Sequence, residues 1–414
     1  MSDTTTTAPP PPPPTEPPAT DAPETPPAPA PQTTWAKFRR AFLVPALALL
    51  LGLFFGAVLM VFTDPDTLRS WASFFRNPTG ALRDSWDLAY SAYSALLRSS
   101  LGSPGAVSET IVAATPLIFG GLSVALAFKA GLFNIGAEGQ LLIGAMAAAF
   151  VGFTFDGLPA VVLLPMSVLA GFVGGALWGF VPGFLKAKTG AHEVIITIML
   201  NYVGIRLVDY LLSTDTVRRT GRADPISKAV DEAARLPKLG GGDLRVHAGI
   251  LLALLATYGV WWLIFRSTIG FRFRAVGANP HAAAFAGMGV GATYILAMSL
   301  AGGLAGLAGT AQLLGVQYSV FPGFSSAYGF DAIAIALLGR THPFGVVAAA
   351  FLFGILRAGA IGMQAATTVP VDIIVVIQAL IIAFMAAPAL VRGIFRIKAG
   401  RTTDTDTFAK SWAT

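Results

Sequence analysis

Long apolar runs recur along the chain from residue 42 almost to its C-terminus, and shorter polar segments separate them. Most runs are close to about 20 residues, the length that an α-helix needs to cross the hydrocarbon core of a bilayer. The pattern predicts an all-α, polytopic bundle of about ten transmembrane helices. We place them at 42–62, 108–128, 133–155, 159–182, 193–212, 248–265, 290–314, 326–339, 344–361 and 371–391.

Composition supports a membrane protein and argues against a soluble one. Hydrophobic residues make up 54% of the chain and charged residues 12%, whereas charged residues are about 25% of a typical soluble domain. The net charge is +6, but the basic residues gather beside apolar runs and form no basic stripe with interleaved aromatics. The lipid bilayer is therefore the expected partner, and no nucleic acid is expected.

The two ends of the chain differ from the apolar region between them. Residues 1–34 are mostly Pro, Thr and Ala, which cannot bury a core, so we predict a disordered tail. The transmembrane domain is expected over 35–400, followed by a short tail at 401–414. Basic residues before the first run favour a cytoplasmic N-terminus, and an even number of spans returns the C-terminus to the cytoplasm. The loops 63–107 and 213–247 then lie outside the cell, where we expect mixed-charge caps with short amphipathic helices.

Two runs are interrupted or too short to cross a bilayer. The segment 326–339 would reach only about 21 Å as a helix, against a core of about 30 Å. The segment 131–139 contains three glycines together with Asn134 and Glu138. Broken helices are tolerated at membrane depth where they pack against protein or line a cavity. We therefore expect a solute pathway at these two segments.

The two interruptions resemble each other, because each places an acid after a glycine near the start of a helix. The acids are Glu138 and Asp331, and the helix dipole favours a carboxylate at such a position. The expected topology starts the two helices from opposite sides of the membrane, as in an inverted repeat, and transport sites tend to lie between the halves of such repeats. Both acids could instead simply cap helices in a packed bundle, and the sequence leaves the two interpretations open.

Polar residues at membrane depth are the candidates for the translocation pathway. Arg206 and Asp209 are three residues apart, which favours an internal structural ion pair, and Arg357 has no obvious partner in the sequence. Polar groups inside a membrane are often functional. The predicted pathway residues are Asn134, Glu138, Asn201 and Asp331.

Glycines at four-residue intervals predict close contacts between spans. One small-residue face holds Gly302 and Gly306. The other is built from four glycines, Gly171, Gly175, Gly179 and Gly183. Faces of this kind let helix backbones approach closely, so we interpret both as packing surfaces rather than as a substrate groove.

The chain lacks the residues of several catalytic and cofactor sites. It has no cysteine and only four histidines, which are scattered, so no catalytic residue and no metal ligand is predicted. No Gly-x-x-x-x-Gly-Lys-Ser/Thr run is present to hold nucleotide phosphates. We expect no enzyme activity and no cofactor in this chain, and any ATP that powers it must be bound by another chain.

The loop 266–289 contains the signals of a short, capped helix. Asn279 suits the N-cap and Pro280 the first helical position. Three alanines at 282–284 favour helix, and Gly287 can end it in the left-handed conformation. We predict a helix of about two turns on the cytoplasmic face. A plain connection between spans would not need such caps, so the helix indicates a docking element.

This loop resembles the coupling-helix region of ABC importer permeases in the branched-chain amino acid, ribose and nucleoside group. The similar run is Arg274-Ala-Val-Gly277-x-Asn279-Pro280-x-Ala282-Ala283-x-x-x-Gly287. Three further runs resemble the simple-sugar and nucleoside permeases that work with a Bmp-type binding lipoprotein, namely Ala130-Gly-Leu-Phe-Asn134-Ile-Gly136-Ala-Glu138-Gly139-Gln140, Thr197-Ile-Met-Leu-Asn201-Tyr202 and Gly329-Phe-Asp331-Ala-Ile-Ala-Ile-Ala-Leu-Leu338-Gly339. The similarity covers residues 40–395 but does not extend to the proline-rich tail or match the 213–247 loop.

The resemblance implies a multi-pass permease subunit that moves nucleosides, or less closely simple sugars, into the cell. Its implied partners are a second permease, two cytoplasmic ABC ATPase subunits that bind the ATP, and an extracytoplasmic substrate-binding lipoprotein. The helix from Pro280 to Ala286 would dock in a groove of an ATPase, and an Ala283→Glu change would weaken that association without unfolding the chain. The implied coupling residues are Arg274, Gly277, Asn279, Pro280, Ala282, Ala283 and Gly287.

Two other classes of function compete with this interpretation. An ion-coupled secondary transporter could use buried Glu138 and Asp331 to carry protons. A membrane enzyme, such as a lipid or glycan transferase, is disfavoured because the sequence shows no cluster of acids, histidines or metal ligands.

Overall fold

The computed structural model describes residues 34–222, 224–241, 244–367 and 369–396. Most of the two tails expected at 1–34 and 401–414 therefore lies outside the described residues. The chain divides into two compact units, 1–43 and 44–414, and the features below belong to the second. In the described part, the regular elements are helices, and strand-like pairing is limited to the isolated bridges Arg218–Ser227 and Lys238–His247.

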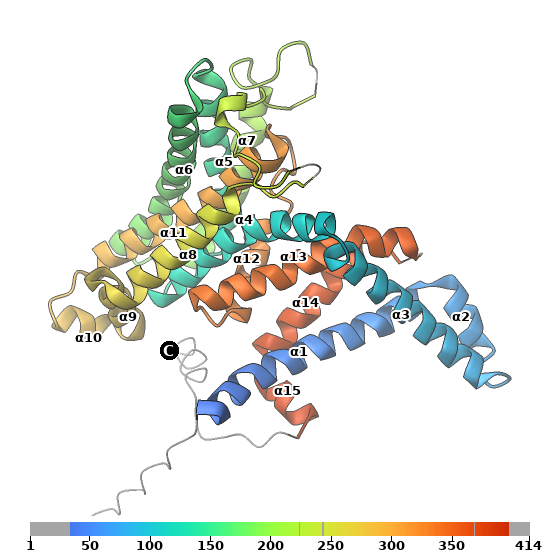
Figure 1. The fold of residues 1–414 in the computed structure, drawn as a ribbon. Coiled ribbons are helices and arrows are strands. Elements are labelled where there is room, and N and C mark those ends of the chain that lie inside the picture. The colour runs from blue at the N-terminus through green and yellow to red at the C-terminus, as the bar shows by residue number, and fades with distance from the viewer. Residues whose placement is uncertain (1–33, 223, 242–243, 368, 397–414) are drawn as a thin grey trace, which may run out of the picture. The chain divides into compact units, whose positions relative to one another are not determined.

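The helices follow one another along the chain as shown in Figure 1. Their bounds are α1 Thr34–Thr63, α2 Pro65–Ala72, α3 Pro78–Leu101, α4 Pro104–Lys129, α5 Ala137–Thr154, α6 Ala160–Thr189, α7 Glu193–Ser213, η1 Glu232–Ala234, α8 Gly249–Arg266, α9 Thr268–Ala278, α10 Pro280–Phe285, α11 Val290–Gln312, η2 Leu313–Gln317, α12 Tyr328–Leu338, α13 Pro343–Ala366, α14 Asp372–Ala386 and α15 Pro388–Ile394.

The expected all-α membrane bundle is confirmed. Eight described helices are long and apolar enough to cross a membrane, and Tyr328–Leu338 and Asp372–Met385 are shorter apolar helices. The first of these is the short segment expected at 326–339. The second differs from the full span expected at 371–391, because the helix ends at Ala386 and a new one begins at Pro388. Proline lacks the backbone N–H of a continuous helix and disfavours helix in the residue before it.

The two long loops have the structure expected of them only in part. The segment 63–107 contains the short amphipathic helix α2, as expected, but also α3, a helix of 24 residues that packs on α13. The segment 213–247 contains one described 3₁₀ turn, Glu232–Ala234, and otherwise irregular chain. Its backbone is bonded to η2, the π-helical turn that follows α11: Leu236 N–H, for example, donates to Leu314 O at 2.9 Å, because the last carbonyl groups of a helix lack intrahelical partners.

The two glycine faces are packing surfaces, as predicted, and the structure shows that they pack against each other. A Cβ placed on Gly175 would lie 2.3 Å from the carbonyl oxygen of Gly302, and one on Gly302 would lie 2.3 Å from that of Gly175. A Cβ on Gly306 would likewise lie 2.3 Å from the carbonyl oxygen of Gly171. The backbones of α6 and α11 are therefore in direct contact, which only residues without a side chain permit.

Candidate functional site

The two interrupted spans meet inside the bundle. The chain leaves α4 at Lys129, runs irregularly and enters α5 at Ala137, while α12 begins at Tyr328. A Cβ on Gly329 would lie 2.3 Å from the Cα of Glu138, so the N-terminal turns of α5 and α12 touch where only glycine fits. Figure 1 shows α12 beside α4 in the interior of the helix assembly. The fold thus brings together two segments that are far apart in the sequence, since 191 positions separate Glu138 from Gly329.

The Glu138 carboxylate links the N-terminal ends of α5 and α12 by hydrogen bonds. One of its oxygens accepts the N–H of Gly329 at 2.8 Å, and the other accepts the hydroxyl of Ser325. Glu138 is buried in the first turn of α5. A negative charge at the start of a helix is stabilised by the helix dipole, and here one carboxylate serves two helices.

Asn134 and Gln140 hold the irregular segment before α5. The Asn134 amide donates to Gln140 Oε1 at 2.8 Å, and the Gln140 amide donates to Asn134 Oδ1 at 3.2 Å. Asn134 Oδ1 also accepts the N–H of Gly136 at 3.1 Å. Asn134 is fully buried, so these bonds replace the ones that a continuous helix would provide. The sequence did not predict the role of Gln140, whose only signal is a polar residue at the head of an apolar helix.

Asn201 ties α7 to the same segment. Its amide donates to the carbonyl of Ile135 at 2.9 Å, and its Oδ1 accepts the N–H of Gly139 at 2.9 Å. Both partners are backbone groups at the broken end of α5, which would otherwise lack a bond in an apolar environment. A single mid-span amide therefore satisfies one donor and one acceptor.

Asp331 and Arg357 form an ion pair next to this junction. Their side chains approach to 2.6 Å and are about one-fifth exposed. Arg357 also donates to the carbonyl of Ser326 at 2.9 Å, and its guanidinium lies 4.2 Å from the ring centroid of Tyr328. The partner of Arg357 was not obvious from the sequence because it lies 26 residues away.

The four predicted pathway residues therefore lie in one neighbourhood. Asn134, Glu138 and Asn201 surround the start of α5, and Asp331 is two residues beyond the Gly329 contact. Each is hydrogen-bonded within the fold. The contacts of Glu138 are those of a helix cap, the alternative that the sequence left open, and solute contact stays a prediction for all four.

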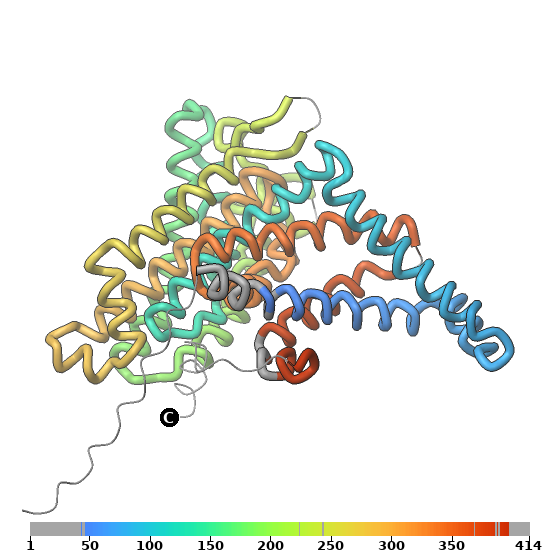
Figure 2. Tube along the Cα trace, turned by 60° about the horizontal axis from the view of Figure 1, so that its bottom comes forward, coloured from blue at the N-terminus to red at the C-terminus, as the bar shows by residue number. Residues whose placement is uncertain are grey.

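The capped helix of the 266–289 loop is present as α10. Asn279 Oδ1 accepts the N–H of Ala282 at 3.0 Å, Pro280 opens the helix, and Gly287 is left-handed with φ +78°. A further helix, α9, was not expected; it places Arg274 and Gly277 on a helix rather than in a loop. Both Figure 1 and Figure 2 show α9 and α10 together at one end of the second unit.

We expected Ala283 on the docking surface of α10, but a different residue of this helix is exposed. Ala283 is only 4% exposed, so the proposed Ala283→Glu change would bury a charge, and we expect it to disturb the fold as well as docking. Phe285 is 95% exposed, and the sequence analysis missed it. An aromatic side chain held this far out on a capped helix is typical of an interface anchor.

A pair of glycines connects the α9–α10 region to the first interrupted span. A Cβ on Gly131 would lie 2.9 Å from the Cα of Gly277, and one on Gly277 would lie 2.5 Å from the carbonyl oxygen of Lys129. Gly131 is left-handed, with φ +72°. The end of α9 therefore rests directly on the residue where the broken segment begins.

Residues 106–401 match the family model described as branched-chain amino acid transport system / permease component. The chain belongs to this permease family. Permeases of this kind are transport subunits in the membrane rather than enzymes, and they work with ATPase and binding-protein partners. Among solved structures, none matches this chain significantly.

Three curated relatives are similar to the permease over most of its length. The guanosine ABC transporter permease protein NupP of Bacillus subtilis is 40% identical, over 84% of this chain and 94% of that protein. The nucleoside ABC transporter permease protein NupB of Lactococcus lactis is 34% identical, over 85% and 92% respectively. The glucose ABC transporter permease protein TsgB13 of Haloferax volcanii is 40% identical, over 71% and 79%.

The permease also carries an ion pair on its surface that was expected inside the bundle. Arg206 and Asp209 approach to 3.4 Å, but their side chains are 84% and 36% exposed. The ion pair expected from the spacing is therefore present, but on the exposed side of the helix, because α7 packs through the side that contains Asn201 and Gly204.

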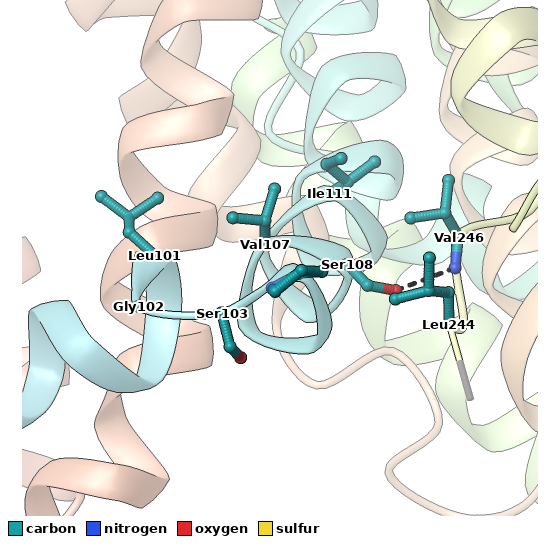
Figure 3. A pocket seen from close by; sticks show the side chains of 9 residues that line it. Leu101, Gly102, Ser103, Val107, Ser108, Ile111, Leu244 and Val246 are labelled. Atoms are coloured by element: carbon teal, nitrogen blue, oxygen red, sulfur yellow. Dashed lines mark hydrogen bonds between the residues drawn. The ribbon is translucent and has the colours of Figure 1, made fainter. Parts of the chain in front are cut away.

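An open groove of about 500 Å³ lies where α3 passes into α4 (Figure 3). Its walls are mostly apolar, with Leu101, Val107 and Leu244 among them. The hydroxyl of Ser108 accepts the N–H of Val246 at 3.1 Å, so this polar group already has a protein partner. The groove offers little that would bind a polar solute.

Proposed function

We infer that this permease is the membrane subunit of an ABC importer that moves nucleosides into the cell. The observation that carries the proposal is its 40% identity to a guanosine permease over 94% of that protein, supported by similarity to a nucleoside permease over 92% of another. A simple sugar is the second candidate, because the glucose permease is also 40% identical, though over 79% of its length.

The expected assembly contains a second permease, two ATPase subunits and an extracytoplasmic substrate-binding lipoprotein. On this proposal ATP binds to the ATPase subunits, and no cofactor is needed in this chain. We place both termini in the cytoplasm, together with α9 and α10. The basic residues in the last turns of α6 and α8 support this orientation, because positively charged loops are retained on the cytoplasmic side.

The α9–α10 region is the proposed contact with an ATPase. On this proposal Asn279, Pro280 and Gly287 shape α10, and Phe285 fills a pocket of the partner. Ala283 supports the helix from within, and Gly277 transmits movement to the interrupted span through Gly131. Two further coupling residues have exposed side chains in the same region. They are Arg274 and Ala282.

The junction of α5 and α12 is proposed to border the translocation pathway. Half-helices that meet with their N-terminal ends are typical of transport sites between inverted halves. The four predicted pathway residues would hold the ends of the broken helices there; they are Asn134, Glu138, Asn201 and Asp331. A movement at Gly131 would then change the packing of the junction.

Uptake measurements test the proposal directly. Cells that contain the complete transporter should accumulate labelled guanosine, and deletion of this chain should abolish that uptake. Depletion of intracellular ATP should stop it, whereas a protonophore at constant ATP should not. Guanosine uptake that survives the deletion would overturn the substrate assignment, and uptake that follows the proton gradient instead of ATP would favour the ion-coupled alternative.

A further inference from the structure

The outer side of α7 combines aromatic rings with a charge. Tyr202, Arg206 and Tyr210 follow one another at four-residue intervals, so they share one face with steps of about 6 Å. Tyr202 is 65% exposed. An open groove of about 450 Å³ runs along this face and is lined by Tyr202, Val203, Arg206, Leu207 and Tyr210. The groove is open, and all of its lining residues belong to α7, so a ligand held there would need a facing wall from another chain.

The neighbouring spans have outer faces of a different kind. The exposed face of α6 includes Val161, Leu169 and Leu177, and no charged residue occurs in the chain from 160 to 185. The exposed face of α8 carries Tyr258 and Trp262 beside Leu251 and Leu255, and its charge comes only at the terminal Arg266. The face of α7 differs from both because it has charged residues, Arg206 and Asp209, within the span.

The depth of these side chains argues against lipid contact for α7. Arg206 lies seven residues before Ser213, the last residue of α7, which places it about 10 Å inside that end. A charged side chain within the hydrocarbon costs about 2.5–3.5 kcal/mol or more, and Asp209, the partner of Arg206 at 3.4 Å, is a second charge in the same part of the helix. Tyrosines that anchor a helix lie at the membrane surface, whereas Tyr202 is near the middle of the helix.

We propose that Tyr202, Arg206 and Tyr210 line the aqueous translocation pathway and contact the base of the nucleoside. The phenol rings offer flat surfaces on which a base can stack. The Arg206 guanidinium lies between them and can donate two parallel hydrogen bonds to the carbonyl and ring nitrogen at the edge of a guanine base. Asp209 restrains the guanidinium at 3.4 Å. This assignment rests on the nucleoside proposal for the substrate class.

The opposite side of α7 connects this face to the interrupted span. Asn201 is adjacent in the chain to Tyr202 and bonds to Ile135 O and Gly139 N–H. A change at the start of α5 therefore moves the helix that presents the aromatic face. The second permease would supply the facing wall of the pathway.

Single-cysteine labelling tests the position of the face. The natural chain has no cysteine, so each engineered thiol is the only one in this chain. Tyr202→Cys, Arg206→Cys and Tyr210→Cys would be compared with Leu177→Cys and Leu255→Cys, which are similarly exposed but lie on α6 and α8. A membrane-impermeant, charged methanethiosulfonate is applied to membranes that contain the complete transporter during turnover.

The three α7 positions should react about tenfold faster than the two controls, and guanosine should slow their reaction. Equal, slow reaction at all five positions would overturn the inference, because it would leave the face in lipid or covered by protein. Arg206→Gln should also lower guanosine uptake about tenfold, the effect of losing one charge-assisted hydrogen bond, with the protein still inserted in normal amounts.

The outcomes separate this inference from the proposed function. If wild-type cells take up guanosine but the α7 cysteines react like the controls, the inference alone fails. If wild-type cells take up glucose and not guanosine, and glucose protects the rapidly reacting α7 cysteines, the pathway position is supported while base recognition and the nucleoside proposal both fail.

Discussion

A single carboxylate, that of Glu138, joins the first turns of two helices that are far apart in the chain. It accepts from Gly329 N–H at 2.8 Å and from Ser325, while Asn134 and Asn201 satisfy the backbone around it. At the scale of residues, the broken spans are therefore stable because a few polar side chains replace helical hydrogen bonds.

Glu138→Ala should destabilise the permease by about 1–3 kcal/mol, because it leaves buried donors without an acceptor. Unfolding followed in detergent measures the change. Glu232→Gln is the matched control, since Glu232 is an exposed acid that pairs with Arg235 and its loss should cost less than about 0.5 kcal/mol. Equal stability of both variants would contradict the role of Glu138 as a double cap.

His247 should make stability depend on pH. The ring is buried against Gly315, its Nδ1 accepts Gly249 N–H at 3.2 Å, and burial, reinforced by the charge of Arg245, lowers the pKa of His247 to about 4. In the unfolded chain the pKa is about 6.5, so the unfolded state binds the proton first as the pH falls.

The contribution of His247 to stability is complete above pH about 6.5 and is lost as the pH falls to about 4, with a full size of about 3 kcal/mol. Unfolding measured across this range should show the loss in the wild type and a smaller one in His247→Gln. An unchanged pH dependence in the variant would assign the effect to other groups.

At the scale of elements, helix contacts decide where small residues and large residues are required. The α6–α11 contact works because glycine backbones touch, with Gly175 against Gly302. On α10, by contrast, a large residue is exposed: Asn279 and Pro280 form the start of the helix, and Phe285 projects from it.

Gly175→Ala should destabilise the permease by about 1–3 kcal/mol, because its Cβ would lie 2.3 Å from a carbonyl oxygen and the helices would have to separate. Gly259→Ala on α8 is the control. A Cβ there meets nothing within 4 Å, so the substitution should stabilise the helix by about 0.5–1 kcal/mol. Thermal unfolding of the two variants gives the comparison, and equal shifts would contradict the close α6–α11 contact.

Phe285→Ala should weaken association with the ATPase by about 2 kcal/mol or more, the loss expected for a central aromatic anchor. Co-purification of the ATPase with the permease measures it. Trp86→Ala on α3 also removes an exposed aromatic residue and should change nothing. Undiminished binding by Phe285→Ala would remove α10 as the docking element.

At the scale of the whole molecule, a continuous chain of contacts runs from α10 to the junction of α5 and α12. It passes from α9 through Gly277 and Gly131 to the irregular segment, and then through Glu138 to Gly329. The region proposed to dock the ATPase and the junction proposed to border the solute pathway are therefore connected through direct contacts.

Gly277→Ala should weaken the coupling between ATPase docking at α10 and solute transport at the junction of α5 and α12. Its Cβ would lie 2.5 Å from Lys129 O, which displaces α9 from the broken segment but leaves Phe285 free to dock. We expect normal ATPase co-purification and uptake reduced severalfold. Gly289→Ala is the control in the same region, because its Cβ meets only Ala292 at 3.7 Å. Loss of co-purification together with uptake would show that Gly277 acts on docking instead.

The sequence by itself determined the membrane class, most of the spans, the short segment at 326–339, the capped α10 helix and the family. These properties follow from local patterns, since the bilayer fixes the length and polarity of a span and caps are set by neighbouring residues. The glycine faces were also predictable, because a four-residue interval defines one side of a helix.

Only the tertiary structure decided which distant segments meet. The Glu138–Gly329 contact and the Asp331–Arg357 pair join residues separated by 191 and 26 positions, and no local pattern contains such a pairing. The direction in which a side chain points also depends on packing, which buried Ala283, exposed Phe285 and placed Arg206 on the outside of α7. A periodic pattern defines the two sides of a helix, but its neighbours decide which side is covered.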